Sequence, residues 1–160
     1  MKLQILAVGR MKSGPERELY DRYADRIAKS GRSMHLAGPE LIEIAESRKP
    51  NANSRKSEEA QELIARLGEG SRIVMLDERG KDLSSSEFSD FIRDEQEMGT
   101  SSLAFIIGGP DGHGDAMANA AALTIRLGKM TWPHQIARIL LVEQIYRAIT
   151  ILSGHPYHRE

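Results

Sequence analysis

The sequence predicts an α/β protein in which a mostly parallel sheet is flanked by helices. Short, continuous apolar runs bounded by turn residues are typical of strands buried on both faces. They alternate along the chain with longer segments whose apolar residues recur at helical spacing. Strands that alternate with helices indicate a parallel, layered sheet. The chain has 160 residues, which is the usual size of one domain. The part of the chain on either side of its most linker-like segment could not form a complete sheet alone, so we expect a single domain over residues 1–160.

Five segments are expected to form strands. Leu3–Gly9 is apolar and ends in glycine, and Glu40–Glu46 alternates Leu and Ile with charge, as a half-exposed edge strand does. Arg72–Asp77 and Ser102–Gly109 are continuous apolar runs that predict strands covered on both faces. Leu123–Gly128 is a weaker fifth candidate.

Four segments are expected to form helices. Pro15–Lys29 has a proline near its first turn, and Ser57–Leu67 places Ala, Leu and Ile on one face. Ser85–Met98 begins with the letters SSSE, which suit an N-cap followed by an acid. Pro133–Leu152 is the longest. The polar stretch Glu46–Glu58 is expected to be a mobile loop.

The last helix is apolar on more than one face, because residues 139–142 read Ile-Leu-Leu-Val. A surface helix needs only one apolar stripe. Either this helix is buried centrally in one chain, or one face covers the sheet and another meets a second copy in a two-fold dimer. We favour the dimer, which predicts that Ile139→Asp or Val142→Asp gives inactive monomers.

Composition restricts the function without choosing it. The chain has no cysteine, which excludes disulfides and thiolate zinc sites and fits a cytoplasmic protein. The opening letters MKLQILAVGR are too short for a signal sequence, and no stretch approaches a membrane span. The net charge of −1 disfavours a bulk electrostatic nucleic-acid binder, but a local patch or a second subunit could still contact RNA.

A glycine-rich segment, IIGGPDGHG at residues 106–114, follows a predicted buried strand. A strand that runs into several glycines is typical of a ligand site lined by backbone at the carboxyl end of a sheet. The spacing fails the dinucleotide pattern, because position 117 is methionine, and no Gly-Lys-Ser/Thr follows as in a phosphate loop. A plain tight turn is the alternative.

Two further segments are ambiguous when read alone. LGKMTWPHQIAR, residues 127–138, offers free amides and a tryptophan that suit an adenine or thioether-like ligand. Its tryptophan and proline could equally be a hydrophobic staple and a first-turn residue. RIVMLDERG, residues 72–80, places two acids where a strand meets a loop, which could simply face water.

The segment HPYHRE, residues 155–160, is rich in side chains that transfer protons or contact phosphate. Two histidines three residues apart, without an evident carboxylate partner, are weak evidence for a metal, so we expect none. A solvated tail is the default reading. Because the tail follows the apolar helix directly, dimer packing could instead hold it over a neighbouring site.

Together the segments MKLQILAVG, RIVMLDERGK, FIIGGPDGHG, LGKMTWPHQIARILLVEQIYRA and HPYHRE resemble the RlmH family of SPOUT-type methyltransferases. The resemblance spans essentially the whole chain and is strongest in its C-terminal half. It implies an α/β fold with a C-terminal trefoil knot, a homodimer, and S-adenosylmethionine as methyl donor. The implied substrate is a pseudouridine of 23S rRNA, methylated at N3 on the assembled ribosome.

The resemblance also implies which loops hold the cofactor. By position these are the ends of two strands and the loop before the last helix: Leu76, Gly108, Leu127, Gly128, Lys129, Met130, Thr131 and Trp132. S-adenosylmethionine has no phosphate, which agrees with the missing phosphate loop. The sequence departs from the family pattern at His113 and Gly114, where ordinary helix-starting residues are expected, and in the bulk of Gly128 and Trp132.

Methylation at N3 of a uracil-type ring requires that the N3 proton leave. Histidine suits that task near neutral pH, so His158 and Tyr157 are the candidates, with Arg159 steadying the oxygens of the base or a phosphate. His155 is a weaker candidate for an orienting role. Basic residues that could contact rRNA are Arg10, Lys12, Arg48, Lys49, Arg55 and Lys56.

The sequence leaves two alternative functions open. A non-catalytic nucleotide-binding or ribosome-associated module could share the fold. A related SPOUT enzyme that modifies tRNA would share both the fold and the cofactor, and would differ only in its substrate.

Overall fold

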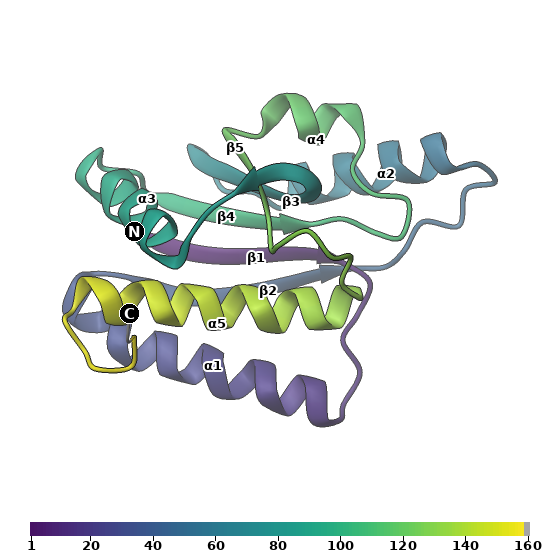
Figure 1. The fold of residues 1–160 in the computed structure, drawn as a ribbon. Coiled ribbons are helices and arrows are strands. Elements are labelled where there is room, and N and C mark those ends of the chain that lie inside the picture. The colour runs from purple at the N-terminus through teal and green to yellow at the C-terminus, as the bar shows by residue number, and fades with distance from the viewer. Residues whose placement is uncertain (159–160) are drawn as a thin grey trace.

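The computed structural model describes residues 1–158 and contains a five-stranded sheet whose paired strands are all parallel (Figure 1). The strand order is β2-β1-β4-β3-β5. The strands are β1 (Lys2–Val8), β2 (Ala37–Ile44), β3 (Ser71–Asp82), β4 (Ser102–Ile107) and β5 (Leu123–Arg126). The helices are α1 (Pro15–Gly31), α2 (Ala52–Ala65), α3 (Ser85–Glu97), α4 (Asp115–Ala120) and α5 (His134–Leu152), with a 3-10 turn at Arg32–Met34. The predicted α/β class and parallel sheet are confirmed.

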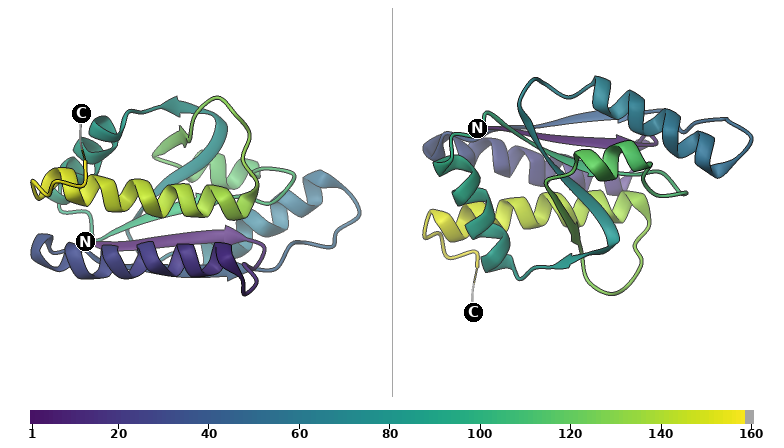
Figure 2. Two further views of the ribbon diagram at one scale, coloured as in Figure 1. Left: turned by 60° about the horizontal axis from the view of Figure 1, so that its bottom comes forward. Right: turned by 90° about the horizontal axis from the view of Figure 1, so that it is seen from above.

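Both faces of the sheet are covered by helices. Successive side chains of a strand point to opposite faces. Leu3, Ile5 and Ala7 of β1 therefore enter the core beneath α1, α3 and α5, while Leu6 and Val8 pack on the side of α2 and α4. Figures 1 and 2 show α5 and α1 side by side on one face, with α2 and α4 on the other. This explains why β1 and β4 are almost continuously apolar.

The packing of α5 corrects the expectation that Ile139→Asp or Val142→Asp would give monomers. Helix α5 contacts α1 and α3 as well as the sheet, so most of its circumference is buried within one chain. Ile139 is 8% exposed and Val142 is fully buried. An aspartate at either position would disrupt the core itself, so these substitutions do not test dimer formation. The half-exposed apolar residues of this helix include Ile136 and Leu140.

Two local predictions were wrong. Helix α2 begins inside the segment expected to be a loop, because the Asn51 side chain caps it by accepting a hydrogen bond from the Ser54 amide at 2.8 Å. Helix α4 was not predicted; it is only six residues long and buries Met117 against the α2 side of the sheet. The expected cap of α3 is confirmed, since Ser84 and Glu87 form a reciprocal capping box.

Within residues 1–158, no helix is both long enough and apolar enough to cross a membrane.

Candidate functional site

The carboxyl ends of β3, β4 and β5 lie together because the three strands are parallel neighbours. The β3–β4 pairing ends at Leu76 opposite Ile107, and the β3–β5 register shifts between Leu76 and Lys81. Residues 77–80 therefore leave the regular ladder. With the segments that follow β4 and β5, they surround a pocket of about 340 Å³. That volume is in the range of pockets that bind small molecules.

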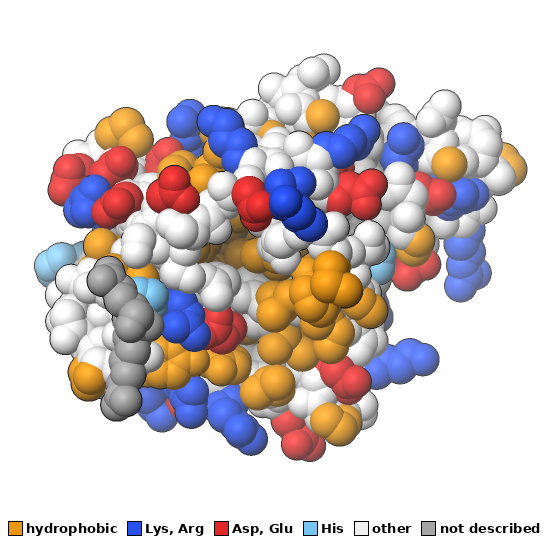
Figure 3. All heavy atoms as spheres, in the orientation of Figure 1, with side chains coloured by type: hydrophobic (Ala, Val, Ile, Leu, Met, Phe, Trp, Pro, Cys, Tyr) orange, Lys and Arg blue, Asp and Glu red, His pale blue; other side chains and the backbone are white. Residues whose placement is uncertain are grey.

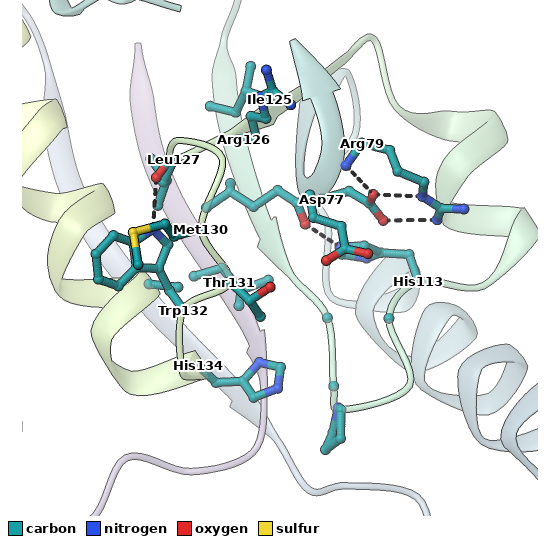
Figure 4. A pocket seen from close by; sticks show the side chains of 18 of the residues that line it. Asp77, Arg79, His113, Ile125, Arg126, Leu127, Met130, Thr131, Trp132 and His134 are labelled. Atoms are coloured by element: carbon teal, nitrogen blue, oxygen red, sulfur yellow. Dashed lines mark hydrogen bonds and ion pairs between the residues drawn. The ribbon is translucent and has the colours of Figure 1, made fainter. Parts of the chain in front are cut away.

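The pocket is lined by most of the residues that the resemblance assigns to the cofactor. Those that line it are Leu76, Gly108, Leu127, Gly128, Met130, Thr131 and Trp132. Lys129 is exposed and does not line the pocket. Sequence reasoning left out Asp77, Arg79, His113, Arg126 and His134, which also line it (Figure 4). For two of them the sequence did hold a signal in their position. Asp77 lies at the end of a predicted strand, and His113 directly follows the glycines.

The glycine-rich loop after β4 is folded back on itself and held from outside. The Gly112 amide donates to the Gly109 carbonyl at 2.9 Å, and Gly112 has a φ of 84° that favours glycine. Arg55 of α2 donates to both carboxylate oxygens of Asp111, at 2.6 and 3.1 Å. Arg55, a candidate for rRNA contact, thus takes part in an ion pair that fixes the loop.

The loop before α5 forms the apolar wall of the pocket. The Trp132 indole donates to the Leu127 carbonyl at 2.8 Å, which closes the loop. Gly128 has a φ of 94°, and a Cβ there would meet open space. Met130 is 73% exposed and Trp132 is 40% exposed. In Figure 4 these two side chains lie on one side of the pocket, and Asp77, Arg79 and His113 lie on the other.

The polar side of the pocket has its charges already paired. Asp77 accepts from the Arg79 amide at 2.9 Å and from its guanidinium at 3.0 and 3.2 Å, which lowers the pKa of the Asp77 carboxyl. The His113 Nε2 lies 2.7 Å from the Leu76 carbonyl oxygen. Burial lowers the pKa of the His113 imidazole, so the ring is neutral at neutral pH.

These groups suit a nucleoside-like ligand without a phosphate. Apolar side chains and main-chain groups can hold a flat heterocycle, and no lysine-bearing phosphate loop is present in the segments that line the pocket. Asp77, Glu78 and Asp111 lie among the lining residues together with Arg79 and Arg126, and Asp77 and Asp111 are already paired with Arg79 and Arg55.

The described residues of the tail do not line this pocket within one chain. Helix α5 has 19 residues and spans about 28 Å at a rise of about 1.5 Å per residue. The pocket is at its first turn, whereas the tail follows its last turn and folds back, so that Tyr157 contacts Glu143 near the middle of the helix (Figure 1). The structure therefore does not bring the predicted catalytic residues Tyr157 and His158 to the pocket of their own chain. Arg159 lies outside the described residues.

The described part of the tail is docked on α1 and α5. The Tyr157 hydroxyl donates to Glu143 at 3.1 Å and lies 3.3 Å from the Tyr23 hydroxyl, and burial raises the pKa of Tyr157. The His155 Nδ1 accepts from the Tyr157 amide at 3.2 Å. The Nδ1 of His158 is buried and has no hydrogen-bond partner among residues 1–158. In the same residues, no cluster of three or more His, Asp or Glu is placed to hold a metal.

Fold and pocket together define an α/β protein with a ligand cradle at the carboxyl ends of three parallel strands. The family described as "Predicted SPOUT methyltransferase" matches residues 1–158. The chain is 52% identical to "Ribosomal RNA large subunit methyltransferase H" of Brucella anthropi and 51% identical to the protein of that name in Agrobacterium fabrum. Each match covers 99% of both chains. The chain therefore belongs to the SPOUT methyltransferase family.

A structural comparison adds a weaker similarity. A crystal structure described as a probable methyltransferase from Bordetella pertussis Tohama I matches with a TM-score of 0.49 and 13% identity. That match covers 92% of this chain and 95% of the other. The family assignment rests on the sequence matches.

Proposed function

We propose that this chain is a cytoplasmic, S-adenosylmethionine-dependent methyltransferase that methylates N3 of a pseudouridine in 23S rRNA on the assembled ribosome. It acts as a homodimer. One observation carries the proposal: relatives named ribosomal RNA large subunit methyltransferase H are about half identical to it over 99% of both chains. Seven of the eight residues to which the resemblance assigns the cofactor also line one pocket, which supports the proposed donor.

The residues of the pocket fit S-adenosylmethionine. Leu76, Leu127 and Met130 would provide apolar contact to the cofactor, and the main chain at Gly108, which lines the pocket, would lie beside it. When bound, the cofactor supplies a methyl group for in-line transfer, so the main task of these loops is to position it.

The substrate side needs a group that takes the N3 proton. His158 suits this role, because an imidazole nitrogen can accept a proton and its Nδ1 lacks a partner among the described residues. Burial and the contacts with Tyr23 and Glu143 raise the pKa of Tyr157, so it stays a neutral phenol that orients the tail or donates a hydrogen bond. Arg159 is assigned to the oxygens of the base or to a phosphate.

The separation of tail and pocket within one chain supports a dimer. An antiparallel pairing of two α5 helices would place the tail of one chain over the pocket of the other, whereas in a single chain Tyr157 packs on Glu143, about 14 Å along α5 from the helix start that borders the pocket. An apolar patch lies where such a partner would dock (Figure 3). It is formed by Met130, Trp132, Ile136 and Leu140.

The proposal is tested by offering three substrates with labelled S-adenosylmethionine: assembled ribosomes, free 23S rRNA and tRNA. We expect methylation of ribosomes, with the product identified as N3-methylpseudouridine by mass spectrometry of nucleosides. Thr131→Trp, which fills the pocket from its exposed rim, is the control and should abolish incorporation. Methylation of tRNA alone would identify a tRNA enzyme. Cofactor binding and stable ribosome association without methyl transfer would identify a non-catalytic module.

The role of the tail is tested by deleting residues 157–160. We expect unchanged affinity for S-adenosylmethionine in calorimetry and loss of methyl transfer to ribosomes. Retained methyl transfer would remove the tail from the mechanism.

A further inference from the structure

His113 lies between the glycine-rich loop and α4, on a segment with little freedom to move. A Cβ on Gly114 would lie 2.6 Å from the Lys56 carbonyl oxygen, so the chain just after His113 is pressed against α2. A Cβ on Gly108 would lie 3.1 Å from the His113 Cε1. The imidazole therefore packs directly on the turn that follows β4, and its own backbone is anchored on the opposite side by α2.

From this anchor, His113 reaches a second loop of the pocket. Its Nε2 lies 2.7 Å from the carbonyl oxygen of Leu76, the last residue of β3 that pairs with β4. A carbonyl only accepts, so Nε2 carries the hydrogen and donates it. The bond thus links the two strand ends where the regular β3–β4 ladder stops and the chain of β3 turns away as residues 77–80.

The surroundings of the ring favour its neutral form. Burial lowers its pKa, although Asp77 lies close enough to oppose the shift. Arg79 and His134 are the other charged or titratable groups near the ring, and both lower its pKa. A neutral ring with hydrogen on Nε2 is a single tautomer, which gives a directional donor.

We propose that His113 is a positioning residue that ties the end of β3 to the glycine-rich loop and so preforms the cofactor cradle. The inference rests on the proposed function, in which Leu76 and Gly108 hold S-adenosylmethionine. It also gives a role to one of the positions at which the sequence departs from its family resemblance. A leucine could fill the same volume but could not donate to the Leu76 carbonyl, whereas the amide of a glutamine could.

The test compares His113→Leu with His113→Gln. We expect His113→Leu to weaken S-adenosylmethionine binding about fivefold in calorimetry, as for one lost hydrogen bond. Its KM for the cofactor should rise by a similar factor, while kcat on ribosomes stays within about twofold of wild type. His113→Gln should bind within about twofold of wild type, because it restores the donor.

Each outcome decides a separate point. Equal cofactor affinity of wild type and His113→Leu would overturn the inference, and so would a glutamine variant as weak as the leucine variant. A wild-type protein that binds no S-adenosylmethionine would refute the proposed function instead. Should His113→Leu fail to fold, the nitrogen NMR shifts of the wild-type imidazole decide: hydrogen on Nε2 supports the inference, and hydrogen on Nδ1 overturns it.

Discussion

Arg138 gives the sharpest prediction on stability, because it is a charged residue that is only 1% exposed. From α5 it donates to the Val8 carbonyl at 2.7 Å, the Gly9 carbonyl at 2.8 Å and the Glu43 carboxylate at 2.7 Å. It thereby fixes the end of β1 and the neighbouring β2 to the helix that begins at the pocket. Arg138→Met keeps an unbranched stem, although a shorter one, and removes all three bonds.

The expected loss follows from the groups left behind. Removing one partner of a buried ion pair costs about 3–5 kcal/mol. The Glu43 side chain is 15% exposed and keeps a bond from the Met11 amide, so we expect the lower end, a loss of about 3 kcal/mol. Glu43→Gln, which still offers an oxygen to both donors, is the milder matched control.

The assay is urea denaturation followed by circular dichroism for wild type, both single variants and the double variant. We expect a non-additive cycle, because the double variant leaves no unpaired buried charge. A loss below about 1 kcal/mol for Arg138→Met, or a strictly additive cycle, would refute the reasoning.

Three further predictions test other parts of the structure. The contact with Arg79 lowers the pKa of the Asp77 carboxyl in the folded state. Wild type should therefore be more stable to unfolding than Asp77→Asn above about pH 4, and this difference should vanish as the pH falls through the folded-state pKa. Because Arg79 is exposed, the difference in unfolding free energy should stay below about 1 kcal/mol in urea titrations. A difference that grows as the pH falls would contradict this prediction. Gly80→Ala should destabilise the fold by several kcal/mol in the same assay, since its Cβ would lie 2.5 Å from the Ile125 backbone, whereas Gly68→Ala should change stability by less than about 1 kcal/mol. Leu140→Asp should give folded monomers by light scattering and circular dichroism, whereas Val142→Asp should unfold; a folded dimer of the Leu140 variant would argue against the proposed interface.

Local sequence signals explain what could be predicted. The apolar runs of β1 and β4 reflect burial on both faces, and the Ser84 capping box is contained within four residues. The Asn51 cap is equally local, but the charged residues that follow it hid the start of α2. Short α4 has too few turns for a periodic pattern.

Long-range features needed the structure. The hydrogen bond between His113 and Leu76 joins residues 37 apart in sequence, and the bulge at residues 77–80 depends on the register with β5. The apolar excess of α5 indicated more than one packing partner, but sequence could not tell that α1 and α3 of the same chain bury Ile139 and Val142. The trefoil knot implied by the resemblance stays a prediction.

The central claim is that the cofactor pocket of one chain and the tail of its partner form one methyl-transfer site. A heterodimer carrying two different tags tests this directly, with Thr131→Trp in one chain and residues 157–160 deleted from the other. Each variant alone should be inactive on ribosomes. If the site is shared, the heterodimer has one complete site of two and should recover about half the wild-type rate. If each chain uses its own tail, no complete site exists, and an inactive heterodimer would contradict the account.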